Sequence, residues 1–140
     1  MISNNLTMSW KYKGNYITEL ADMPENVFGF IYKITNTQTG EYYIGKKEAA
    51  LITDKRMKKY EMVTKESDWK LYRSSNVTVK KWFDDAKISS NCTLEILRFC
   101  LNAKSLTYYE LQEQFSHNVL ADELALNDNL LGKFFRKDLE

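Results

Sequence analysis

Residues 28–47 read FGFIYKITNTQTGEYYIGKK and contain two short runs of aromatic and β-branched residues. Runs of this composition favour β-strands, and the polar stretch between them, residues 36–40, has the composition of a tight turn. We therefore predict a β-hairpin whose strands cover residues 27–35 and 41–44.

The rest of the chain alternates helix and strand signals. Asn76 is a favourable N-cap for a helix of about ten residues, residues 92–101 have strand composition, and Ser105 is a suitable cap for a second helix. Residues 1–26 form a polar lead-in that ends near the lone proline, and residues 27–140 form one domain. This order predicts an α/β fold, an α+β sandwich with a three-stranded antiparallel sheet flanked by helices.

The composition, 44% apolar and 28% charged over 140 residues, is that of a globular domain with one hydrophobic core. No run approaches the roughly 20 apolar residues of a membrane span. The first residues also lack the apolar segment of a secretory signal. We therefore expect a cytoplasmic protein with no membrane partner. Cys92 and Cys100 are expected to be reduced core thiols, because two cysteines and one histidine are too few for a zinc site.

The charge is distributed unevenly along the chain. Between Lys46 and Lys81, eleven Lys and Arg residues stand against five acidic residues, a net charge of +6, whereas the rest of the chain carries −5. A basic face on a nearly neutral chain suits contact with a polyanion. The alternative is a solvated lysine-rich surface that binds nothing.

Ile31-Tyr32 is followed along the hairpin by Tyr43-Ile44-Gly45, and this pair of motifs resembles the GIY-YIG nuclease family. The resemblance extends over residues 27–137, through a basic segment, a helix, a third strand, a helix that carries a glutamate, and a late asparagine. The stretches WKLYRSS, LTYYE and LNDNLLG are similar to small, free-standing phage-type members. The resemblance implies a GIY-YIG-like sheet and a Mg²⁺-dependent endonuclease that cuts DNA, in the host cytoplasm if the protein is phage-encoded.

The same resemblance implies a set of catalytic residues: Tyr32, Tyr43, Lys47, Arg56, Glu110 and Asn127. Tyr32 would accept the proton of the attacking water, directly or by relay, while Tyr43 hydrogen-bonds the phosphate or the water. A tyrosine with the usual pKa of ~10 is a base near neutral pH only if cations lower that pKa. Both hydroxyls are expected on one exposed face. Gly45 is expected to end the strand and to turn the following lysines back over the tyrosines.

Glu110 is implied as the single protein ligand of Mg²⁺, for which Mn²⁺ is the expected substitute. A Mg²⁺ that keeps most of its waters needs only one or two protein carboxylates. Asn127 would brace the site through hydrogen bonds, with Asn129 as the alternative. Family members often carry an arginine and then a histidine after the second tyrosine. The matching window here has no histidine, so the catalytic cation is Lys47, Lys46 or Arg56, with Arg73 as a more distant alternative.

Contacts to the nucleic acid are predicted for Lys46, Lys58, Lys59, Trp69, Arg73 and Lys80. The lysines and the arginine would bind phosphates, and the tryptophan would stack on a base. The alternative for these aromatic residues is burial beneath the stems of lysine side chains. Two other functions remain open: a nucleic-acid-binding module on the same fold that does not cleave, and a protein that binds another protein through its aromatic N-terminal segment.

Overall fold

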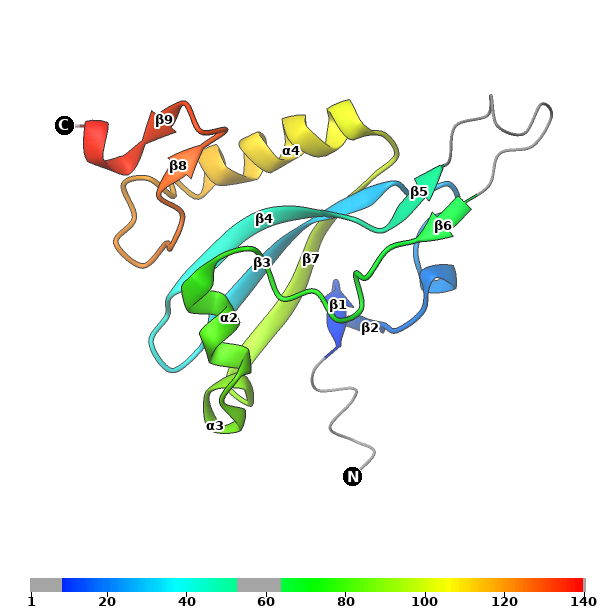
Figure 1. Ribbon diagram of the computed structural model, residues 1–140, viewed down its shortest axis with the longest axis horizontal. Coiled ribbons are helices and arrows are strands. Elements are labelled where there is room, and N and C mark those ends of the chain that lie inside the picture. The colour runs from blue at the N-terminus through cyan, green and yellow to red at the C-terminus, as the bar shows by residue number, and fades with distance from the viewer. Residues whose placement is uncertain (1–8, 53–63, 140) are drawn as a thin grey trace.

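The computed structural model describes residues 9–52 and 64–139 (Figure 1). A five-stranded sheet forms its centre. In chain order the elements are β1 (Trp10–Tyr12), β2 (Asn15–Ile17), η1 (Leu20–Asp22), β3 (Gly29–Asn36), β4 (Tyr42–Glu48), β5 (Ala50–Ile52), β6 (Thr64–Glu66), α2 (Val77–Phe83), α3 (Ala86–Ser89), β7 (Cys92–Cys100), α4 (Ala103–Ser116), β8 (Asn129–Leu130), β9 (Phe134–Phe135) and η2 (Arg136–Asp138).

The central sheet has the strand order β2-β1-β7-β3-β4. Strands β7, β3 and β4 are antiparallel neighbours, which confirms the predicted antiparallel centre of the fold. The sheet has five strands rather than three, because a hairpin from the lead-in adds β1 and β2, with β1 parallel to β7. Trp10 of β1 is 1% exposed and belongs to the core, so the lead-in contributes to the packing of the sheet.

The predicted hairpin is present, with a longer second strand. The Asn36 side chain accepts a hydrogen bond from the backbone N–H of Gln38 at 3.0 Å, and Gly40 has a φ of +84°, as the turn requires. Strand β4 continues through Glu48. The expectation that Gly45 ends the strand is therefore wrong. Lys46 and Lys47 are strand residues and point to opposite faces of the sheet.

The two predicted helices are present, but α2 has seven residues rather than about ten, and α4 starts at a different residue. Asn76 caps α2 as predicted, since its side chain accepts from the N–H of Val79 at 3.0 Å. Helix α4 begins earlier than the predicted start at Ser105. Asn102 is its cap, because the Asn102 side chain accepts the N–H of Ser105 at 2.8 Å.

Helices α2 and α3 lie on one side of the sheet and α4 lies on the other (Figure 1). Each face of the sheet carries a hydrophobic core. The core on the α2 face contains Trp10, Phe30, Tyr32, Ile34, Trp69, Val79, Trp82, Leu94 and Ile96. The core on the α4 face contains Ile31, Tyr42, Ile44, Cys100, Leu106, Val119, Ala125 and Leu130. In the described part of the chain, no helix has the length and apolar character needed to cross a membrane.

Candidate functional site

The two motif tyrosines lie on the same face of the β3–β4 hairpin. Tyr32 is paired with Gly45 across the strands, and its ring centroid lies 6.3 Å from that of Tyr43. A Cβ at Gly45 would lie 2.6 Å from the Tyr32 hydroxyl oxygen and 3.0 Å from Tyr43 Cε2. Glycine is therefore needed inside this strand because the Tyr32 ring lies directly over it.

Tyr32 is not on an exposed face, contrary to expectation. Its side chain is 1% exposed and is packed edge-on against Trp10 and Phe30. Burial raises the pKa of Tyr32, and the weaker effect of a hydrogen bond from Ser74 lowers it only in part. The condition that cations lower this pKa is therefore not met among the described residues.

Tyr43 is the more accessible of the two tyrosines. It is half-buried, and burial raises the pKa of its hydroxyl. The negative charge of Glu110 raises this pKa further. The hydroxyl of Tyr43 consequently stays protonated at neutral pH and is available as a hydrogen-bond donor.

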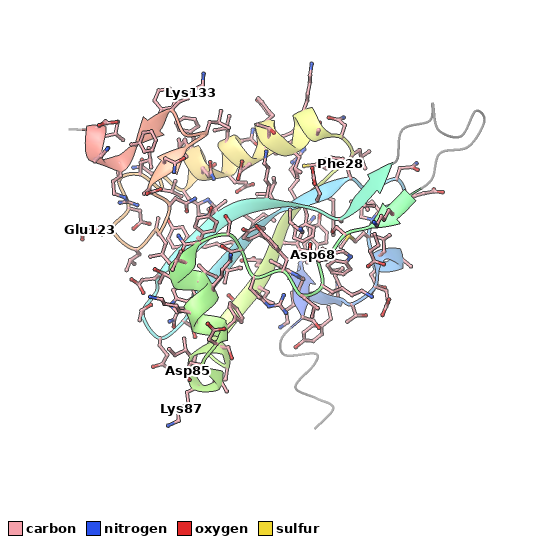
Figure 2. The ribbon with its side chains drawn as sticks, in the orientation of Figure 1. Phe28, Asp68, Asp85, Lys87, Glu123 and Lys133 are labelled. Carbon is pink, nitrogen blue, oxygen red and sulfur yellow. The ribbon has the colours of Figure 1, made fainter. Side chains whose placement is uncertain are left out.

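The two lysines after the second motif diverge to opposite sides of the sheet. Lys47, on the tyrosine face, forms an ion pair with Asp68, and its Nζ lies 4.4 Å from the centroid of the Tyr72 ring. Figure 2 labels Asp68 on the segment that joins β6 to α2. Lys46, on the α4 face, donates a hydrogen bond to Thr107 Oγ1 at 2.9 Å. Arg56, the third cation considered, lies outside the described residues.

Glu110 projects from α4 to the free edge of β4. Burial raises the pKa of its carboxyl group, and the nearby Lys46 ammonium opposes that rise. Glu110 and Tyr43 approach the edge from the two faces of the sheet and line one cavity of about 270 Å³, which we call the β4-edge cavity. Its lining residues are Tyr43, Lys46, Glu110, Gln114, Asn127, Asp128, Asn129 and Leu131.

Asn127 is the asparagine that supports this edge. It is 3% exposed, its Nδ2 donates to the carbonyl of Ile44 at 2.8 Å, and its Oδ1 accepts the N–H of Ile44 at 3.1 Å. Gln114 donates to the same carbonyl at 3.1 Å. Asn129 instead accepts the N–H of Gly132 at 2.9 Å, in the turn between β8 and β9. Side chains thus satisfy the backbone N–H and carbonyl of Ile44 at the outer edge of β4, while those of Tyr42 bond to the backbone of Leu124 and Leu126.

The donor set at the β4-edge cavity fits a Mg²⁺ ion that keeps several waters. Glu110 and Asp128 each supply a carboxylate to the cavity lining, and hard cations prefer oxygen ligands. Among residues 9–52 and 64–139, no three His, Cys, Asp or Glu side chains gather into a closed metal centre. The arrangement therefore suits a metal held by one or two carboxylates and completed by water and substrate oxygens.

The residues predicted to contact nucleic acid differ in their exposure to solvent. Trp69 is 0% exposed and lies in the core on the α2 face, so the prediction that it stacks on a base is wrong. The Arg73 guanidinium donates to the carbonyls of Lys70 and Tyr72, and burial lowers its pKa. Lys80 is exposed on α2. Lys58 and Lys59 lie outside the described residues.

Three residues at the site had no assigned role in the sequence prediction. Asp128 and Gln114 line the β4-edge cavity, and Asp68 binds Lys47. Asp128 directly follows the asparagine of the late motif, which is the one signal that could have identified it. Asp68 and Gln114 lie far along the sequence from the residues that they contact, and only folding of the chain brings them together.

Comparison with known proteins agrees with this fold. A family model described as "Putative endonuclease segE, GIY-YIG domain" matches residues 10–135, a range that includes β1 and β2. The chain belongs to the GIY-YIG endonuclease family. It is accordingly a nuclease of this family, of the segE kind. Searches of curated proteins and of solved structures gave no match.

Proposed function

We propose that this protein is a Mg²⁺-dependent endonuclease that hydrolyses phosphodiester bonds in DNA at the free edge of β4. The observation that carries the proposal is that Tyr43 and Glu110, from opposite faces of the sheet, line one cavity. A phosphodiesterase needs a held water, a cation near the scissile phosphate and help for the departing oxygen. The β4-edge cavity combines residue types suited to each of these requirements.

Glu110, with Asp128 beside it, would hold the metal. When bound, Mg²⁺ would neutralise charge on the phosphate and lower the pKa of a bound water. Mn²⁺ is expected to replace it, because both ions accept carboxylate and water oxygens. The burial that raises the pKa of Glu110 makes its ionised form costly without a cation, so binding of a cation relieves that cost.

The remaining residues would orient the substrate. The protonated hydroxyl of Tyr43 donates to a phosphate oxygen or to the attacking water, and Lys46 supplies positive charge at the same cavity. Lys47 is bound to Asp68, so a phosphate that uses Lys47 must first displace this carboxylate. Asn127 holds β4 in place through Ile44 and thereby fixes the position of the neighbouring Tyr43.

The DNA would approach over the basic segment between Lys46 and Lys81. Of the predicted phosphate contacts, Lys46 and Lys80 are exposed in the described part of the chain, which suits this role. Contacts by Arg56, Lys58 and Lys59 remain predictions. Arg73 makes backbone contacts that hold the segment before α2, and we assign it a supporting role there.

A supercoiled plasmid incubated with the purified protein tests the proposal. Relaxed or linear product that forms with Mg²⁺ or Mn²⁺ and is absent with EDTA supports the nuclease. A gel shift of the same DNA without cleavage in either metal would instead identify a nucleic-acid-binding module. Absence of both cleavage and binding would favour a protein-interaction role.

A further inference from the structure

A third tyrosine stands beside the two motif tyrosines. Tyr72 lies in the segment between β6 and α2, and its ring meets that of Tyr32 edge-on, with centroids 6.0 Å apart and an interplanar angle of 76°. Tyr72 contributes to the raised pKa of Tyr32 and to that of Tyr43. The three tyrosines therefore form one cluster.

Tyr72 is the member of this cluster that meets solvent on two sides. On one side it lines a cavity of about 260 Å³ together with Lys46 and Lys47, and Lys46 also lines the β4-edge cavity that holds the reacting groups in the proposed function. On the other side it lines a cavity of about 730 Å³ together with Ser75 and Lys80. The buried Tyr32, at 1% exposure, has no comparable access.

A cation lies beside the ring of Tyr72. The Lys47 ammonium lies 4.4 Å from the ring centroid, where a cation is attracted to the aromatic face. Asp68 holds Lys47 in this position by an ion pair, and the backbone N–H of Tyr72 bonds to the Asp68 carbonyl at 3.1 Å. The ring and the ammonium are thus anchored through the same residue.

We propose that Tyr72, rather than Tyr32, transfers the proton of the attacking water, with Tyr32 as a positioning residue behind it. The assignment rests on the proposed nuclease function. As the water oxygen bonds to phosphorus, one water proton passes to Tyr72 Oη and the phenolic proton of Tyr72 passes to solvent in the second cavity. The P–O bond to the leaving oxygen breaks in the same displacement, and the leaving oxygen takes a proton from solvent. The tyrosine ends neutral, and the proton count balances. The phenolic proton leaves ahead of the arrival of the water proton, and Lys47 stabilises the negative charge that develops on Tyr72 Oη in between.

The matched variants are Tyr72→Phe, Tyr32→Phe and, as a control, Tyr108→Phe, whose side chain is 60% exposed on α4. Phenylalanine keeps the ring packing and removes only the hydroxyl. Tyr72→Phe should lower kcat by ~10²–10⁴, the range for loss of a proton-transfer group, with unchanged DNA affinity and melting temperature. Tyr32→Phe should cost about tenfold, as expected for one lost supporting hydrogen bond. The Tyr108→Phe variant should match the wild type.

The cleavage rate in mixtures of H₂O and D₂O separates proton transfer from a structural effect. Two protons in flight give a curved dependence on the deuterium fraction in the wild type, and Tyr72→Phe should lose this curvature. Wild-type cleavage by Tyr72→Phe, or a slowed variant that keeps the curve, would overturn the assignment. Failure of the wild-type protein to cleave DNA would overturn the proposed function itself. This result is obtained before any variant is made.

Discussion

Replacement of Gly45 by alanine tests the fit between the two tyrosine motifs. The added Cβ would lie 2.6 Å from Tyr32 Oη, 2.8 Å from Tyr32 Cζ and 3.0 Å from Tyr43 Cε2. Non-bonded atoms normally stay about 3.5–4.0 Å apart, so the rings must move by roughly half an ångström or more. Tyr32 is enclosed by Trp10 and Phe30, and it has little room to move.

This overpacking should destabilise the fold by about 1–3 kcal/mol. For a chain of 140 residues that corresponds to a melting temperature lowered by roughly 3–10 °C. The direction of the change in stability is informative, because replacing glycine by alanine inside an ordinary strand would stabilise a protein by about 0.5–1 kcal/mol. Displacement of the tyrosines should also reduce DNA cleavage.

Thermal unfolding of Gly45→Ala, Tyr32→Phe and the double variant measures the effect. Tyr32→Phe removes the atom nearest to the new Cβ, so alanine should cost less in this background, with a coupling of about 0.5–1 kcal/mol. Thr93→Ala, at an exposed position of β7, is the control for strand substitution. If Gly45→Ala melts at or above the wild-type temperature and cleaves DNA normally, the account of this glycine is refuted.

Three further predictions follow from contacts at the site. Asp68→Asn should free Lys47 and strengthen DNA binding, with a log–log salt slope steeper by about 0.9 for one added phosphate contact, and an unchanged slope would contradict it. Glu110→Gln should melt above the wild type at neutral pH, because burial raises the carboxyl pKa and ionisation then opposes folding. The difference in melting temperature between the variant and the wild type should appear as the pH rises above 4.5, the ordinary pKa of a glutamate. A difference that persists in acid would count against this cause. Asn127→Ala should destabilise the protein by about 1–3 kcal/mol by leaving the N–H of Ile44 unpaired, measured by denaturant unfolding, whereas Asn129→Ala should cost less.

The hairpin was predictable because its information is local. β-branched and aromatic runs flank a turn, and the alternation along each strand then places Tyr32 and Tyr43 on one face. The β1–β2 hairpin was not predicted, since each strand has three residues and mixed polarity. Its attachment to the sheet depends on pairing with distant β7 and on packing of Trp10 against distant Phe30.

The site was predicted less completely, because exposure depends on residues far apart in sequence. Tyr32 is buried by Trp10 and its neighbours, which arrive from the lead-in and from the segment before α2. Trp69 beside Lys70 has the same local pattern whether the ring stacks on a base or fills the core, and the fold decides for the core. Tyr72 lies in the stretch WKLYRSS, but its place at the site became visible only through its contacts with Tyr32 and Lys47.

The matched variants Glu110→Gln and Glu113→Gln test the central claim most directly. Both residues lie on α4 one turn apart, but Glu110 lines the β4-edge cavity, whereas Glu113 lies 3.8 Å from His117 Nδ1. Plasmid cleavage with Mg²⁺ should be abolished in Glu110→Gln and retained in Glu113→Gln, with DNA affinity preserved in both. Undiminished cleavage by Glu110→Gln would contradict a metal-dependent site at the edge of β4.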